Sequence, residues 1–125
     1  MCQQCKNRHG FTLTEVLIGL IILAIGILAI AGLQATSVRG NIFSNNLMQA
    51  TYVAHDSLEF LKYLPLDSPE LQAGNYNPDP ITISGVAFNQ SYTVVADGDL
   101  RTIHYPVTWN DGITHNVTFS TIRSQ

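Results

Sequence analysis

A single carboxylate stands at the edge of the most apolar part of this 125-residue chain. Glu15 precedes 18 consecutive residues, Val16 to Leu33, that are all Val, Leu, Ile, Ala or Gly. A charge within a membrane helix costs about 2.5–3.5 kcal/mol on insertion scales, so a carboxylate there indicates a function that needs it. The chemistry open to Glu15 is ion pairing in a medium of low dielectric. The alternative is that Glu15 reaches the lipid headgroups or stays protonated.

Histidines and cysteines are the other side chains that could carry chemistry. The Cys-x-x-Cys pair near the N-terminus has the spacing of a redox or zinc half-site, but no second pair follows it. His104 and His115 are expected on opposite faces of a sheet, and His55 can pair with Asp56 or Glu59 on a solvated helix face. No nucleophile motif frames the Ser, His and Asp residues. We therefore predict no catalytic site, no metal and no cofactor.

Composition separates the chain into an apolar end and a polar remainder. Charged residues make up 12% of the chain, about half the usual share. Seventeen of the 23 residues from 11 to 33 are apolar, against 37 of the 92 that follow. These figures exclude a multi-domain enzyme, a disordered acidic tail and a polytopic transporter. A net charge of −3 and a pI of about 5.7 argue against a nucleic-acid binder that relies on bulk charge.

The apolar segment is long enough to cross a membrane as one helix. With its flanks it can span ~30 Å of hydrocarbon, and it is longer than the roughly 7–15 apolar residues of a signal-peptide core. Lys6 and Arg8 precede it, whereas residues 34–125 hold four basic and eight acidic side chains. The positive-inside rule therefore predicts a cytoplasmic N-terminus and an external C-terminal part.

The helix is predicted to continue beyond the membrane to about Leu64, where Pro65 stops it. Apolar residues recur at steps of mostly three or four along this continuation. They are Val38, Ile42, Leu47, Ala50, Ala54, Leu58 and Leu61. A helix from Phe11 to Leu64 would be ~80 Å long. We expect the stripe to pack on a small sheet.

The remaining sequence predicts a loop followed by antiparallel strands. The strands are expected at residues 81–88, 91–96, 100–110 and 113–122. A two-residue turn at Asp97-Gly98 would pair Tyr92 with Ile103, and a three-residue loop, 110–112, would pair Trp109 with Ile113. Pro106 falls on a strand, which is tolerable at an edge or at a non-bonded position.

The residues around Glu15 resemble the processing and assembly motif of type IV prepilins. The string is Gly10-Phe11-Thr12-Leu13-Thr14-Glu15-Val16-Leu17-Ile18, after a short basic leader. The stretch Leu23–Gln34 is similar to minor pilins of the PilV type (type IV pilus modification proteins). The I-type minor pseudopilin of type II secretion is a near relative. The chain departs from many pilins because it has no cysteine after residue 5.

The resemblance implies a fold class and an order of segments. The fold would be α+β and pilin-like, a long N-terminal helix packed on a small antiparallel sheet. The segments would be a leader peptide (1–10), a transmembrane and filament-core helix (11–33), its amphipathic continuation (34–64), a loop (65–80) and a β-meander (81–125).

The resemblance also implies site residues and partners. A prepilin peptidase would cut between Gly10 and Phe11 and N-methylate Phe11, and Glu15 would be the charge used in subunit assembly. Gly19, Gly26 and Gly32 would serve helix packing and flexibility. The partners would be other major and minor pilins, the assembly platform of the bacterial inner membrane, and the lipid bilayer before assembly. No small-molecule substrate is implied.

Three functions follow from these observations. The first is a minor pilin that joins a type IV pilus or primes its assembly. The second is an I-type minor pseudopilin, which the residues from Gly26 to Gln34 disfavour. The third is an external binding module that the helix merely anchors. A membrane-anchored enzyme would be a fourth class, but the sequence frames no catalytic group.

Overall fold

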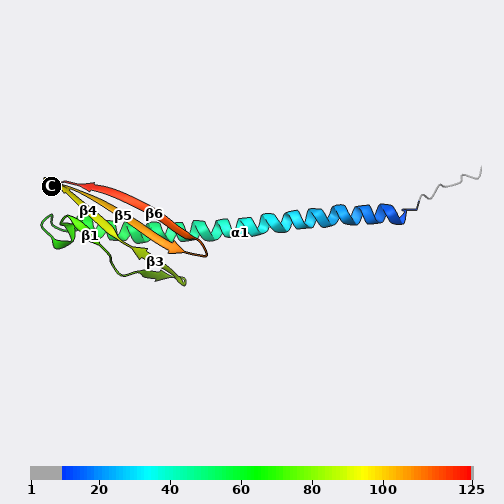
Figure 1. The fold of residues 1–125 in the computed structure, drawn as a ribbon, viewed down its shortest axis with the longest axis horizontal. Helices are drawn as coiled ribbons and strands as arrows, with labels where there is room; N and C mark the ends of the chain where they lie inside the picture. Colours follow the sequence, from blue (N-terminus) through cyan, green and yellow to red (C-terminus); the bar gives the residue numbers. More distant parts are fainter. Residues whose placement is uncertain (1–9, 125) are drawn as a thin grey trace, which may run out of the picture. The chain divides into compact units, whose positions relative to one another are not determined.

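The protein is described by a computed structural model that covers residues Gly10–Ser124 (Figure 1). Its elements are α1 (Leu13–Tyr63), the 3-10 helix η1 (Pro69–Leu71), β1 (Gly74–Tyr76), β2 (Ile81–Ile83), β3 (Val86–Gln90), β4 (Tyr92–Asp97), β5 (Leu100–Asn110) and β6 (Thr114–Arg123). The chain divides into two units, residues 1–40 and 41–125, which are described separately. The predicted α+β class is confirmed, because a long N-terminal helix packs on a small antiparallel sheet.

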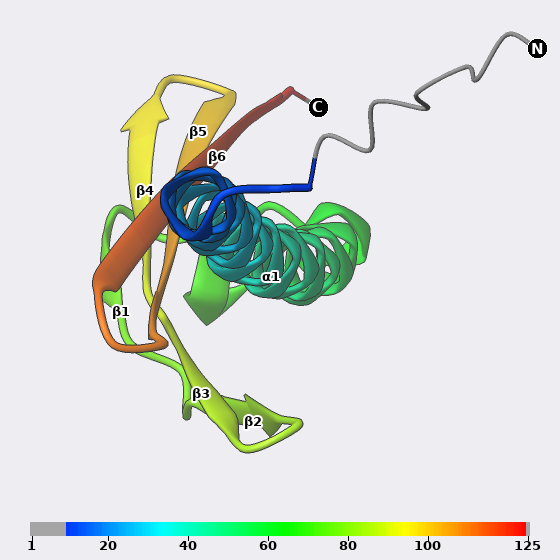
Figure 2. The ribbon, with the colours of Figure 1, turned by 90° about the vertical axis from the view of Figure 1, so that its right-hand side faces the viewer.

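The sheet of residues 41–125 is organised around β5. Strand β6 pairs with β5 from Arg101 to Asn110, so it occupies one whole edge of that strand. Strands β3 and β4 therefore share the other edge, and β3 pairs with β2 while β4 pairs with β1. Figure 2 shows the β2–β3 hairpin at one end of the sheet and the β4–β5 hairpin at the other. All pairings are antiparallel.

Pro106 lies within β5, which is the central strand rather than an edge. Its carbonyl oxygen accepts a hydrogen bond from the Ser91 amide, with a nitrogen–oxygen distance of 3.3 Å. The nitrogen and the carbonyl of one strand residue face the same neighbour, so the missing N–H of Pro106 also faces Ser91. Ser91 is the residue that interrupts β3 and β4. The proline is tolerated because its missing donor falls at this interruption.

One face of α1 is buried against the sheet within residues 41–125. No proline occurs before Pro65, and the helix ends at Tyr63, one residue before the predicted stop. Its buried residues are Asn46, Ala50, Val53, Ala54, Leu58 and Leu61. Four of them, Ala50, Ala54, Leu58 and Leu61, form one core with apolar residues that alternate along the strands, among them Ile103, Tyr105 and Trp109. The two periods that predict packing, 3.6 along the helix and 2 along the strands, meet in this core.

The predicted apolar stripe begins too early in the sequence. Val38 is 57% exposed and Ile42 is 50% exposed, so neither side chain belongs to the core. The buried face starts at Asn46, whose amide nitrogen lies 2.9 Å from the Asp111 carboxylate in the β5–β6 loop. Before Asn46, Phe43 still lies near His115 and Trp109, but it is 39% exposed and does not belong to the buried face.

Both predicted hairpin registers are wrong, because each loop lies one residue later in the sequence than predicted. The β4–β5 pairing places Asp97 opposite Leu100, and the β5–β6 pairing places Asn110 opposite Thr114 and Trp109 opposite His115. Each shift changes the partner by two residues, so the predicted faces are unchanged.

The cause of the second shift is the side chain of Asn110. Its oxygen accepts a hydrogen bond from the Gly112 amide at 2.9 Å, and its nitrogen donates to the Thr114 hydroxyl at 3.0 Å. These bonds place Asn110 on the strand and leave residues 111–113 as the loop. Gly112, with φ of +111°, takes the conformation that suits glycine there.

Two predicted segments contain elements that the sequence did not indicate. The strand predicted at 81–88 is a hairpin, β2–β3, which turns at Ser84-Gly85 with positive φ at both residues. Ser-Gly between apolar residues is a turn signal that the alternation hid. The loop predicted at 65–80 contains η1 and β1, and β1 pairs with β4 from Gly74 to Tyr76. Three residues are too few for a periodic signal, so pairing with β4 decides this strand.

Arg123 joins the last strand to the end of α1. Its guanidinium donates hydrogen bonds to the carbonyls of Leu61 and Leu64. The last carbonyls of a helix have no partner within the helix and carry partial negative charge. A cation from β6 therefore closes the helix and fixes the sheet against it.

We predict that Arg123→Gln lowers the free energy of unfolding by about 1–2 kcal/mol, because charged hydrogen bonds to the helix-end carbonyls are lost. Urea unfolding of the full chain in detergent micelles, followed by fluorescence of Trp109, measures this change. Arg39→Gln is the matched control, because Arg39 makes no hydrogen bond among residues 10–124. Equal stability of the two variants would contradict the assigned role of Arg123.

Candidate processing and assembly site

The residues around the predicted cleavage point lie at the start of α1. Gly10, Phe11 and Thr12 are non-helical and exposed, and the helix begins at Leu13. Phe11 is 83% exposed, and among the described residues no atom beyond the immediate chain neighbours lies within 4 Å of the position that a Cβ on Gly10 would occupy. The Gly10–Phe11 peptide bond is therefore accessible in non-helical chain, as a protease requires. The basic leader and its cysteines lie outside the described residues.

Thr12 caps the first turn of α1. The amide of Glu15 lies 3.3 Å from the Thr12 hydroxyl and 3.0 Å from the Thr12 carbonyl oxygen. The spacing Thr-x-x-Glu is that of a capping box, in which the N-cap hydroxyl satisfies the amide three residues later. Our sequence reasoning missed this function, although the motif could be read directly from Thr12 and Glu15. The cap sets the residue at which the helix starts.

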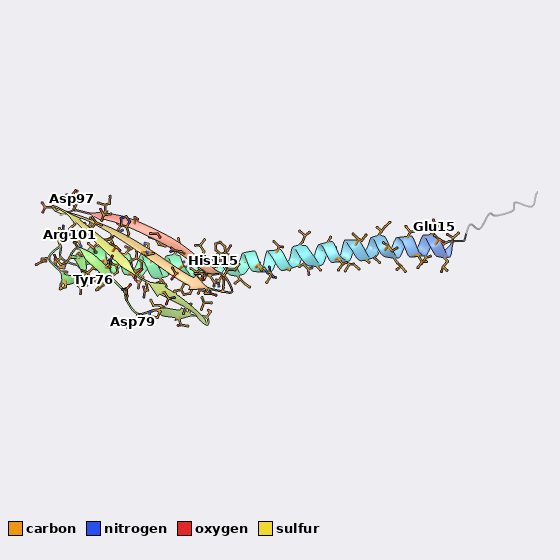
Figure 3. The ribbon with its side chains drawn as sticks, in the orientation of Figure 1. Glu15, Tyr76, Asp79, Asp97, Arg101 and His115 are labelled. Carbon is orange, nitrogen blue, oxygen red and sulfur yellow. The ribbon has the colours of Figure 1, made fainter. Side chains whose placement is uncertain are left out.

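Glu15 lies in the first helical turn, as labelled in Figure 3. A negative side chain is favourable there because the helix N-terminus carries partial positive charge. Glu15 is exposed, and no ion pair forms at its carboxylate among residues 10–124. The structure thus leaves this carboxylate free to meet a positive group from outside the helix.

The glycines predicted to serve helix packing are open on all sides. Apart from the adjoining backbone of the helix itself, no atom of the described chain lies within 4 Å of the place that a Cβ would take at Gly19, Gly26 or Gly32. Seven residues separate Gly19 from Gly26, so these two lie almost above one another at 3.6 residues per turn. Six residues separate Gly26 from Gly32, which places Gly32 about a third of a turn away. The three glycines do not share one face.

The helix from Val16 to Leu33 exposes its apolar side chains in every direction. Each large apolar residue in this range is at least 48% exposed. Among the described residues, α1 is the helix that is long and apolar enough to cross a membrane. Such a surface is stable only when lipid or other protein removes it from water. Every face of this part of the helix is therefore open to contact with lipid or other protein.

The histidines do not meet one another. His55 lies 3.8 Å from Glu59 on an exposed helix face, and His104 lies 2.8 Å from the Ser120 hydroxyl. His115 lies on the opposite face of the sheet from His104, as predicted, and 3.0 Å from Asp111. Within residues 10–124, no three His, Cys, Asp or Glu side chains gather as metal ligands.

Asp111 connects α1 to the β5–β6 loop, which sequence reasoning did not find. Its two oxygens lie 2.9 Å from Asn46 Nδ2 and 3.0 Å from His115 Nε2. The ring of Phe43 lies over His115 with 5.0 Å between ring centres, and that of Trp109 lies 5.2 Å away. The hydrogen bond from Asn46, with further help from His115, holds the pKa of Asp111 below its ordinary value. No local spacing relates residue 46 to residue 111.

One comparison with known proteins found a match, at the N-terminal end of the chain. Residues 5–31 match a family model described as the prokaryotic N-terminal methylation motif. This match covers the capped helix start and most of the exposed apolar helix, and it supports a prepilin-type protein, of the type IV pilin or pseudopilin kind. No curated protein and no solved structure matched the chain.

We predict that Asp111→Asn lowers the melting temperature at neutral pH but has little effect in acid. A lowered pKa in the fold means that the ionised carboxylate contributes stability above its ordinary pKa, near 3.8, and that this contribution is lost as pH falls through the lower folded value. The difference in melting temperature between wild type and variant should therefore shrink below about pH 4. Asp99→Asn, in the exposed β4–β5 turn, is the control. A difference that stays constant down to about pH 2 would contradict the assignment.

Proposed function

We propose that this protein is a minor pilin, a structural subunit that enters a type IV pilus or primes its assembly. The observation that carries the proposal is the methylation-motif match over residues 5–31, on a helix whose apolar surface is uncovered. A structural function also fits the motif, which marks proteins that are processed and assembled rather than enzymes.

The proposed processing step removes the leader by hydrolysis of the Gly10–Phe11 bond on the cytoplasmic side, followed by N-methylation of Phe11. Glycine at the cut suits a narrow protease cleft, because its backbone carries no side chain. Cleavage also removes Lys6 and Arg8, the basic anchor on the cytoplasmic side. The remaining chain has four basic and nine acidic side chains, hence a charge of −5 before the new amine is counted.

The proposed assembly step pairs the new amine with a carboxylate. After cleavage, a positive amine on Phe11 stands four residues before Glu15. In a filament core, the amine of one subunit can pair with Glu15 of a neighbouring subunit. An unpaired charge in low dielectric is expensive, whereas a paired one costs far less. The pair therefore sets the axial position of one helix against the next, and the free Glu15 carboxylate supports this function.

The proposed location follows from the same steps. The precursor crosses the bacterial inner membrane once, with residues 1–10 in the cytoplasm and residues 34–125 in the periplasm. The prepilin peptidase, the inner-membrane assembly platform and other pilins are its proposed partners. Within this class, the Gly26–Gln34 stretch favours a PilV-type pilin over an I-type pseudopilin of type II secretion. Pilus-assembly or secretion genes beside this one would separate the two.

We predict that the native protein begins with N-methylated Phe11 and that Gly10→Val blocks cleavage, because a branched side chain enters the cleft poorly. Intact mass spectrometry of the purified protein measures both outcomes. Gly40→Ala, in the same helix but far from the cut, should be processed normally. A native N-terminus at Met1 would reject the pilin function and favour an anchored binding module.

We predict that Glu15→Ala leaves membrane insertion and cleavage intact but reduces incorporation into filaments by at least about tenfold, the effect of losing roughly 1.4 kcal/mol. Immunoblots of sheared filaments and of membranes measure the two pools separately. Asp67→Ala, at an exposed acid in residues 41–125, controls for loss of negative charge. Wild-type incorporation of Glu15→Ala would reject the pairing step while leaving the processing step standing.

A further inference from the structure

A cavity of about 530 Å³ lies between α1 and the sheet within residues 41–125. Its buried floor is formed by Leu61, Gln90, Tyr92 and Tyr105. Its exposed rim includes three carboxylates, Asp56, Glu59 and Glu70, with the ring of Phe60. A cavity of this volume, with an aromatic floor and polar groups at its rim, has the properties of a binding site.

Two of the residues that line the cavity, Tyr92 and Tyr105, belong to a stack of three tyrosines. Tyr76 of β1, Tyr92 of β4 and Tyr105 of β5 lie on neighbouring strands, with ring centres 4.6 Å and 5.7 Å apart and interplanar angles of 10° and 6°. The two outer hydroxyls are bonded within the fold. Tyr76 donates to the carbonyls of Pro69 and Gln72, and Tyr105 donates to Gln90 Oε1 at 2.6 Å.

The central hydroxyl, that of Tyr92, has no such partner. The residue is only 6% exposed and lines the cavity, yet among residues 10–124 its hydroxyl makes no hydrogen bond. Tyr92 Oη is not one of the fully enclosed polar atoms that lack a partner, so it can be reached from the cavity. Both faces of its ring are covered by the stacked tyrosines, so the hydroxyl is the part of Tyr92 that a ligand can reach.

The charge of the cavity is negative. Its lining includes three carboxylates and no Lys, Arg or His. His55 lies 3.8 Å from Glu59, and neither Asp56 nor Glu70 forms an ion pair within the described chain. Burial, with the neighbouring Tyr76 and the charge of Glu70, raises the pKa of Tyr92 to about 12, so its hydroxyl stays neutral.

None of the Lys and Arg side chains of residues 41–124 lines the cavity. Arg123 is bonded to the end of α1, and Arg101 is bonded to the carbonyls of Gly98 and Leu100 in its own hairpin. Lys62 lines a different hollow on the exposed side of α1. A positive group that enters the cavity must therefore come from another molecule.

We propose that this cavity binds one lysine or arginine side chain presented by a partner protein. The cationic head donates hydrogen bonds to the Glu70 carboxylate and to the oxygen of Tyr92, and the alkyl stem packs against Phe60 and Pro78. A phosphate or carboxylate ligand is disfavoured by the three acids on the rim. This site is independent of processing at Gly10 and of the pairing of Glu15.

The proposal is tested by NMR titration of the full chain in detergent micelles with Nα-acetyl-arginine amide. The uncharged isostere Nα-acetyl-citrulline amide is the control ligand. We expect arginine-dependent shifts at the amides of Glu70 and Tyr92, a millimolar dissociation constant that rises with salt, and about tenfold weaker binding of citrulline. Equal binding of the two ligands would overturn the proposal, because the charge would then be irrelevant.

Variants separate the two contacts. Glu70→Gln keeps the shape of an exposed residue, and Tyr92→Phe removes only the unpartnered hydroxyl, so each should weaken arginine binding about three- to tenfold with an unchanged fold. Asp97→Asn, in the β4–β5 hairpin outside the cavity, should bind as the wild type does. If Tyr92→Phe fails to fold, the arginine affinity of Glu70→Gln alone tests the proposal. Wild-type affinity of Glu70→Gln, or shifts with maltotriose but none with arginine, would overturn the proposal and indicate a sugar site.

Discussion

An apolar helix surface must be removed from water, and α1 meets this constraint in two different ways. Between Asn46 and Leu61, one face of the helix, with Ala50, Val53, Ala54, Leu58 and Leu61, is buried within residues 41–125. From Val16 to Leu33 the apolar side chains are uncovered, and every large one is at least 48% exposed. The hydrophobic effect scales with apolar area, so this second surface commits the protein to lipid or to other subunits. In the function we propose, this surface lies first in the lipid bilayer and then among the other subunits of a filament.

The same constraint explains why Glu15, the single charged residue beside that segment, matters for assembly. Glu15 would be unremarkable on a solvated helix, where a first-turn acid merely suits the helix dipole. Beside an apolar run, its carboxylate needs either water or a cation. The cap at Thr12 occupies the amide of Glu15 and leaves the carboxylate available. Local structure and assembly chemistry thus use different atoms of one residue.

The sheet tolerates the proline in its central strand because the neighbouring strand is interrupted at the same place. Pro106 removes a donor from the central strand at the point where Ser91 interrupts the opposite edge, so the defect of one strand meets the defect of its neighbour. Arg123 and Asp111 then tie the two ends of the buried helix face to β6 and to the β5–β6 loop. These contacts hold the stacked tyrosines and the cavity beside them in one arrangement.

The amino-acid pattern by itself determined the class of the fold, the end of the helix to within one residue, the faces of the strands and the candidate residues Gly10, Phe11 and Glu15. These depend on periodicity, on proline and on a short contiguous motif, all of which are local. The register of each hairpin was missed by one loop position, because alternation of period 2 cannot detect a shift of two residues. In the β5–β6 hairpin, the bonds of Asn110 select the loop. Only the tertiary structure decided that Asn46 meets Asp111, that β1 pairs with β4, and that Tyr92 and Glu70 line one cavity. Those contacts join residues far apart in the chain, and no spacing within the sequence encodes their approach.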